Sequence, residues 1–185
     1  PSTATSYNNI GSVWYHKGEY DKALEFYKKT LQIFLATLGK NHPSTATSYN
    51  NIGFVWHHKG EYDKALEFYN QALQIYLATL GKNHPDTASS YNNIGSVWDS
   101  KGEYDKALEF YNQDLNITIA TLGKNHPSTA ISYNNLAMLY YKMEKYEEAY
   151  NSMKKALKIF QKTLPSEHPY IKTMKRNLEV IKKKL

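Results

Sequence analysis

The hydrophobic positions of this chain recur with a period of 42 residues. His-Pro returns with its proline at positions 43, 85, 127 and 169, and Pro1 begins the same phrase. The chain therefore divides into four repeats, 1–42, 43–84, 85–126 and 127–168, and a partial fifth, 169–185. A period of about 20–50 residues is typical of a solenoid, in which each unit buries its apolar face by stacking on its neighbours.

Each repeat carries two stretches of helical periodicity separated by glycine. In the second repeat, one stretch over about 44–59 places its large side chains at i, i+3, i+6 and i+7, as Tyr49, Ile52, Val55 and Trp56. The other, over about 62–80, carries on one side Ala65, Leu66, Tyr69, Leu73, Tyr76 and Leu80. Gly60 and Gly81 mark the helix ends, and Pro85 suits the first turn of the next helix. The pattern predicts an antiparallel helical hairpin in every repeat.

Glycine is confined to three positions of the repeat, which together account for all nine glycines. One set, Gly11, Gly53 and Gly95, falls inside the first helix, where glycine costs about 1 kcal/mol relative to alanine unless close packing requires it. Ala137, the next smallest residue, stands at the matching place in the fourth repeat. We expect the second helix to cross tightly at this position.

The same frame contains a known motif of small and aromatic residues. Its members in the second repeat are Tyr49, Ile52, Gly53, Trp56, Ala65 and Tyr69, and they recur in register in the other three repeats. The chain thus resembles tetratricopeptide repeat proteins. Tyr-Asn-Asn-Ile-Gly, Ala-Leu-x-Ile and Leu-Gly-x-x-His-Pro, in a 42-residue unit, resemble the repeats of kinesin light chains and nephrocystin-3-like proteins. The resemblance implies an all-α fold: one right-handed α-solenoid of tandem helix-turn-helix hairpins over 1–185, with a capping helix at 169–185.

Composition favours a protein interaction module over a membrane protein. Hydrophobic residues make up 41% of the chain, and no apolar run approaches the roughly 18 residues of a membrane span. The lack of cysteine excludes disulfides and thiol catalysis and favours an intracellular, cytoplasmic setting. Because the chain begins inside a repeat and without methionine, we expect it to be a fragment of a longer protein.

The positive charge lies at the C-terminal end: residues 1–126 have a net charge of −1 and residues 127–185 of +7. The last predicted helix carries the basic residues Lys172, Lys175, Arg176, Lys182, Lys183 and Lys184. Its apolar residues would cover the end of the stack, and these are Ile171, Met174, Leu178 and Ile181. One interpretation is a solvating cap, which terminal repeats need. The other is a patch for nucleic acid or an acidic partner, although no nucleic-acid reading motif accompanies it.

An Asn-Asn pair recurs on the first helix of every repeat, on the side expected to line the concave face. The pairs are Asn8 and Asn9, Asn50 and Asn51, Asn92 and Asn93, and Asn134 and Asn135. A carboxamide has donors and acceptors, so a ladder of them can bind the backbone of an extended peptide. We expect this contact above all from the second member of each pair. The alternative is that one asparagine of each pair bonds a neighbouring repeat or water.

Specificity would then come from the positions on this side that vary between repeats. Tyr15, Phe54 and His57, next to His58, predict an aromatic pocket between repeats one and two, and Met138 and Tyr141 another beside Lys142. The resemblance to kinesin light chains implies that such pockets admit an apolar or aromatic anchor flanked by acids. Tetratricopeptide domains that clamp a chaperone's C-terminal carboxylate use lysines and arginines on the first helices. Only the asparagine positions match in this chain, and there is little positive charge before Lys142, so chaperone tails are disfavoured.

Catalytic and metal-binding interpretations find no support in the sequence. Four of the seven histidines, His42, His84, His126 and His168, are one repeat apart, farther than a helix diameter of about 10 Å, and cannot share a metal. No nucleophile elbow, Walker loop or dinucleotide fingerprint occurs. We therefore expect neither enzymatic activity nor a cofactor. A peptide-binding scaffold is the first functional interpretation, a structural or self-associating spacer the second, and weak nucleic-acid binding the third.

The third repeat departs from its siblings in the second helix. Asp114 replaces Ala72 and Ala156, and Asn116 and Thr118 replace Gln74 and Tyr76. If Asp114 is buried without a partner, it costs about 2 kcal/mol or more. We hypothesise that the third repeat is the least stable and that Asp114→Ala stabilises it.

Overall fold

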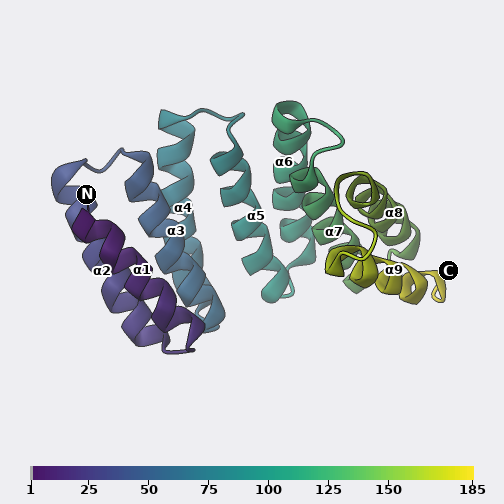
Figure 1. Ribbon diagram of the computed structural model, residues 1–185, viewed down its shortest axis with the longest axis horizontal. Coiled ribbons are helices and arrows are strands. Elements are labelled where there is room, and N and C mark those ends of the chain that lie inside the picture. The colour runs from purple at the N-terminus through teal and green to yellow at the C-terminus, as the bar shows by residue number, and fades with distance from the viewer. Residues whose placement is uncertain (1) are drawn as a thin grey trace.

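The computed structural model describes residues 2–185, which form a curved row of helical hairpins (Figure 1). Pro1, where the first repeat is predicted to begin, lies outside them. The helices are α1 (Ser2–His16), α2 (Tyr20–Thr37), α3 (Pro43–His58), α4 (Tyr62–Thr79), α5 (Pro85–Ser100), α6 (Tyr104–Leu122), α7 (Pro127–Lys142), α8 (Tyr146–Thr163) and α9 (Pro169–Lys182). No strand occurs between residues 2 and 185. The all-α solenoid of hairpins with a C-terminal capping helix is confirmed.

Each hairpin completes its core with residues of the next one. Ile52 and Val55 on α3 are fully buried, and they pack against Ala23 and Leu24 of α2. On α9, Ile171, Met174 and Ile181 are buried against α8 in the same way. Burial of the first-helix apolar residues therefore depends on the preceding repeat, as expected for a solenoid.

The glycine inside the first helix allows the second helix to approach closely. A Cβ added to Gly53 would lie 2.9 Å from a ring carbon of Tyr69, which is 1% exposed. The same contact joins Gly11 to Tyr27 and Gly95 to Tyr111. In the fourth repeat Ala137 and Met153 occupy the two positions, and both are fully buried. The predicted tight crossing of the two helices is confirmed. The small residue faces a tyrosine in the first three repeats and pairs with a methionine in the fourth.

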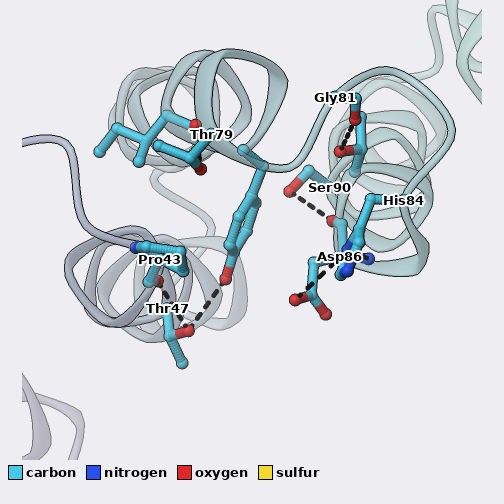
Figure 2. A network of polar contacts seen from close by, with 10 residues as sticks. Pro43, Thr47, Thr79, Gly81, His84, Asp86 and Ser90 are labelled. Carbon is cyan, nitrogen blue, oxygen red and sulfur yellow. Dashed lines mark hydrogen bonds and ion pairs between the residues drawn. The ribbon is translucent and has the colours of Figure 1, made fainter.

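The histidines of the His-Pro connectors are helix caps. The Nδ1 atoms of His42, His84, His126 and His168 accept hydrogen bonds from the backbone N–H two residues later, at 3.1–3.2 Å. In the first three of these connectors a threonine donates to a glycine carbonyl, as in the bond from Thr87 Oγ1 to Gly81 O of 2.9 Å (Figure 2). These bonds fix the entry into each first helix. The sequence alone does not predict this role, because histidine is not among the usual N-cap residues.

We expect His42→Ala to lower the free energy of unfolding by about 1 kcal/mol, because the N–H of Ser44 loses its acceptor. His42→Asn should retain most of the stability, since asparagine is a good N-cap residue. Lys40→Ala, at an exposed position of the same connector, is the control and should change little. Urea unfolding followed by circular dichroism measures all three; equal losses in His42→Ala and His42→Asn would argue against a capping role.

Candidate functional site

The first helices α1, α3, α5 and α7 form one continuous surface. Here α3 contacts α5 directly, and hydrogen bonds and ring contacts join each first helix to the next. We call the side of these helices that carries the Asn-Asn pairs the first-helix face. All residues expected to contact a peptide lie on these four helices.

Asparagines of successive repeats are hydrogen-bonded to each other on the first-helix face. Asn51 Nδ2 donates to Asn8 Oδ1 at 2.7 Å, and Asn135 Nδ2 donates to Asn92 Oδ1 at 2.8 Å. The second asparagine of one repeat thus binds the first asparagine of the repeat before it. This is the alternative that the sequence left open for these residues. Each bonded pair still has an unused carboxamide oxygen and amino hydrogens with which to contact a ligand.

The middle of the row is built differently, around the hydroxyl of Tyr76. This hydroxyl lies 2.9 Å from Thr47 Oγ1. Burial raises the pKa of Tyr76, and hydrogen bonds with Thr47 and Asn50 oppose the shift. The Oδ1 atom of Asn50 is buried without a hydrogen-bond partner in the described chain. Asn93 therefore does not bond Asn50 in the way that Asn51 bonds Asn8 and Asn135 bonds Asn92. The contact of Tyr76 with Thr47 lies within repeat two.

A second row of contacts between repeats runs near the C-terminal ends of the first helices. The rings of Tyr15 and His58 are 5.4 Å apart, and His57 Nε2 lies 2.9 Å from Ser100 Oγ. The corresponding contact in the next repeats is an ion pair between Asp99 and Lys142, at 2.8 Å. Residues predicted to be free for a ligand are in part bound to neighbouring repeats.

The aromatic cluster between repeats one and two contains Tyr15 and Phe54, as predicted, but its third ring is His58 rather than His57. The ring centroids of Tyr15 and Phe54 are 4.9 Å apart, and those of Phe54 and His58 are 4.5 Å apart. His57 turns toward Ser100, and burial lowers its pKa, which keeps it neutral at pH 7. Phe54 is 41% exposed, so the cluster presents an apolar surface to solvent.

The residues grouped at the fourth repeat are separated in the structure. Met138 lines a pocket of about 360 Å³ between α7, α8 and α9, together with Ile131, Phe160 and Tyr170. Tyr141 packs against Tyr146, with ring centroids 5.6 Å apart. The charge of Lys142 is compensated by Asp99, so an acidic ligand finds even less free positive charge here than the sequence indicates.

No group of three or more histidine, aspartate or glutamate side chains is placed to hold a metal ion in residues 2–185. None of the described helices combines the length and apolar character needed to cross a membrane.

The sequence and the fold both match known proteins. A family model described as tetratricopeptide repeat matches residues 2–78, 48–118 and 100–162. BtubC (BKLC) from P. vanneervenii superposes with a TM-score of 0.85 at 24% identity, over 95% of this chain and 70% of its own. A kinesin light chain-like protein of Podosopora anserina with nearly identical TPR-like repeats gives 0.82 at 26% identity, over 100% and 87%.

The apo form of RapI matches with a TM-score of 0.78 at 20% identity, over 96% of this chain and 47% of RapI. Its likeness and that of BtubC concern the fold alone. No curated protein sequence matches the chain.

Proposed function

The chain belongs to the tetratricopeptide repeat family, in its kinesin light chain type, and we propose that it binds an extended segment of a partner protein on its first-helix face. Tetratricopeptide repeat arrays are generally scaffolds for protein–protein interaction. The finer proposal, a peptide in the groove of this chain, rests on the side chains of the first-helix face.

The observation that carries the proposal is the pairing of the asparagines. The bonds from Asn51 to Asn8 and from Asn135 to Asn92 hold four carboxamides in place before a ligand arrives. Binding therefore costs little additional side-chain entropy. A carboxamide has both donors and acceptors, as does the backbone of an extended peptide. Such a surface accepts many sequences.

Apolar anchors would bind beside the asparagines. Phe54 presents an exposed ring supported by Tyr15 and His58, and Met138 lies at the mouth of the apolar pocket against α9. We expect a bound segment to place one apolar residue at either location. Both locations lie on helices that the asparagine row also follows.

We expect the double variant Asn9→Ala/Asn93→Ala to bind selected peptides at least about tenfold more weakly, a loss of roughly 1.4 kcal/mol, with an unchanged melting temperature. These two asparagines make no bond to a neighbouring repeat in the described chain, so their loss should not disturb the stack. The measurement is peptide-display selection on the parent, followed by fluorescence polarisation of the enriched peptides.

Two further variants separate binding from stability. Asn51→Ala/Asn135→Ala removes the bonds between repeats and should lower both the affinity and the melting temperature. Asn70→Ala, at an exposed position of the second helix α4, should change neither. No enriched peptide for the parent, or equal affinity for the parent and Asn9→Ala/Asn93→Ala, would contradict the proposal.

A further inference from the structure

One position of the second helix differs in side-chain size and polarity between the repeats. It holds Phe34, Tyr76, Thr118 and Phe160 in repeats one to four. Tyr76 is 3% exposed, and its ring spans from α4 to Thr47 on α3. Thr118 is far shorter, and its hydroxyl donates to Asp114 Oδ1 at 3.2 Å instead of reaching the first helix.

Pockets of about 190 and 360 Å³ lie beside Phe34 and Phe160, so a pocket at this place does not require a short side chain. The equivalent pocket beside Thr118 lies between α5, α6 and α7. Its volume is about 240 Å³, and we call it the Asp114 pocket. Its walls include Ser89, which stands where Thr47 stands in the second repeat, and the residues Asn92, Asp114, Thr118, Ile131 and Ser132. The pocket adjoins the asparagine row, because Asn92 belongs to both. A segment bound to the row therefore passes its mouth.

The carboxylate of Asp114 is only 6% exposed and is held by two hydroxyls. Thr118 donates to Oδ1, and Ser132 donates to Oδ2 at 2.6 Å. Neither bond brings a positive charge, and no lysine or arginine in residues 2–185 pairs with this carboxylate. Each oxygen retains a lone pair for another donor. A buried charge without a counter-ion is unfavourable, so a cation entering the pocket gains more than it would at the surface.

The third repeat is also more acidic than its siblings on this side. Asp86, Asp99 and Asp114 stand where the other repeats have serine, tyrosine or histidine, and alanine or threonine. Lys142 compensates Asp99. Asp86 and Asp114 have no lysine or arginine partner in the described chain, and His84 lies 3.7 Å from Asp86, so the arrangement of carboxyl groups favours a cationic ligand.

We propose that the Asp114 pocket binds a lysine side chain of the extended partner segment, with the ammonium group at the Asp114 carboxylate and the aliphatic stem along Ile131. An acidic side chain would be repelled, and an apolar one would leave the carboxylate unpaired. Lysine suits the site better than arginine: both carboxylate oxygens already accept hydroxyls, which favours a compact ammonium over a planar fork. The inference rests on the proposed peptide binding at the first-helix face.

The direct test is NMR titration of the whole chain with Nα-acetyl-lysine methylamide. Saturable shifts at Asp114, Thr118 and Ser132 are expected, whereas the neutral Nα-acetyl-norleucine methylamide should cause none. Asp114→Ala, which installs the residue of the second and fourth repeats, should weaken binding at least tenfold. Thr118→Tyr, the residue of the second repeat, should fill the pocket and abolish binding.

Transfer of the site to another pair of repeats separates the loss of ligand contacts from any change in the fold that these variants cause. The double variant Ala72→Asp/Tyr76→Thr places the same two residues between repeats two and three, where the buried Ser90 already matches Ser132. A second lysine site should appear there. Absence of saturable shifts in the parent, or equal shifts with the norleucine amide, would overturn the inference.

The outcomes distinguish the two proposals. In one outcome, the parent selects peptides that have no basic position and yet shows no binding of the lysine amide. This result would support the peptide-binding face and contradict the lysine pocket. Lysine-amide binding together with an empty peptide selection would overturn the proposed function and retain the pocket.

Discussion

Gly53→Ala is expected to lower the free energy of unfolding by about 2 kcal/mol, although alanine is the better helix former by about 1 kcal/mol. The added Cβ would lie 2.9 Å from the Tyr69 ring, which is buried and has no free space to move into. The helices must separate or the ring must leave its rotamer. Urea unfolding of parent and variant measures the difference, and a gain in stability would show that the close approach is not required.

The fourth repeat suggests how this loss can be reversed. There alanine faces a methionine, as Ala137 and Met153, in a fully buried contact. Gly53→Ala/Tyr69→Met should therefore be more stable than the sum of its single substitutions predicts, with a coupling of about 1 kcal/mol or more. Gly60→Ala serves as the control: its residue has φ 77° and no neighbour near the added Cβ, so Tyr69→Met should not rescue its loss.

The sequence predicts the helices well because every repeat contains the same hydrophobic pattern and its own glycines at the helix ends. The first helix of the second repeat, expected over about 44–59, spans Pro43–His58, and the second, expected over about 62–80, spans Tyr62–Thr79. Glycine with positive φ ends most of these helices, as at Gly60 and Gly81. Hydrophobic periodicity and glycine placement are local features of the sequence, so one repeat is enough to predict where its helices lie.

The contacts of the first-helix face could not be predicted in the same way. Asn51 bonds Asn8 and His57 bonds Ser100, in each case 43 residues apart. A repeat length of 42 residues aligns equivalent positions, but it does not show that a side chain reaches the position one residue further in the next repeat. That offset depends on how neighbouring helices are staggered, which no single repeat encodes. The expected peptide contacts of these residues stay predictions.

In the third repeat, the burial of Asp114 could be predicted from the sequence, but its hydrogen-bond partners could not. The sequence identified Asp114 as a break in the pattern, and the structure places it in the interior, as expected. The condition that it lacks partners is wrong, because Thr118 and Ser132 donate to it. Ser132 belongs to the next repeat, and this contact was not visible in the pattern. A departure from a local rule thus marked a pocket, and such departures commonly lie at functional sites.

Asp114→Ala is expected to raise the free energy of unfolding by about 1–3 kcal/mol at neutral pH, despite the two hydroxyl partners. Burial raises the pKa of the Asp114 carboxyl above its ordinary value, and the bonds from Ser132 and Thr118 oppose the shift without cancelling it. Thr118 and Ser132 need not become unsatisfied: Ser132 Oγ already bonds Ser128 O at 3.2 Å, and Thr118 can bond the carbonyl four residues before it. The ionised carboxylate is therefore a net cost to the folded state.

The pH dependence of the gain identifies its cause. Asp114 of the unfolded chain loses its proton near pH 3.8, and that of the folded chain at higher pH. Between the two values the folded state holds a proton that the unfolded state lacks, so parent stability falls as pH rises through this window. The advantage of Asp114→Ala should accordingly be small below pH 3.8 and grow above it. Comparing thermal unfolding of parent and variant across pH cancels the other titrating groups.

Two further variants test whether the gain in stability comes from removing a buried charge in particular. One removes the buried charge of Asp114, and the other removes an exposed charge on the same helix. Asp114→Asn keeps the shape of the side chain and should show most of the stabilisation at neutral pH, because the amide can still accept from one hydroxyl and donate to the other. Glu109→Gln, at an exposed position of the same helix, should change stability by less than about 0.5 kcal/mol at every pH. A gain in Asp114→Ala that persists undiminished at low pH would instead assign the effect to packing.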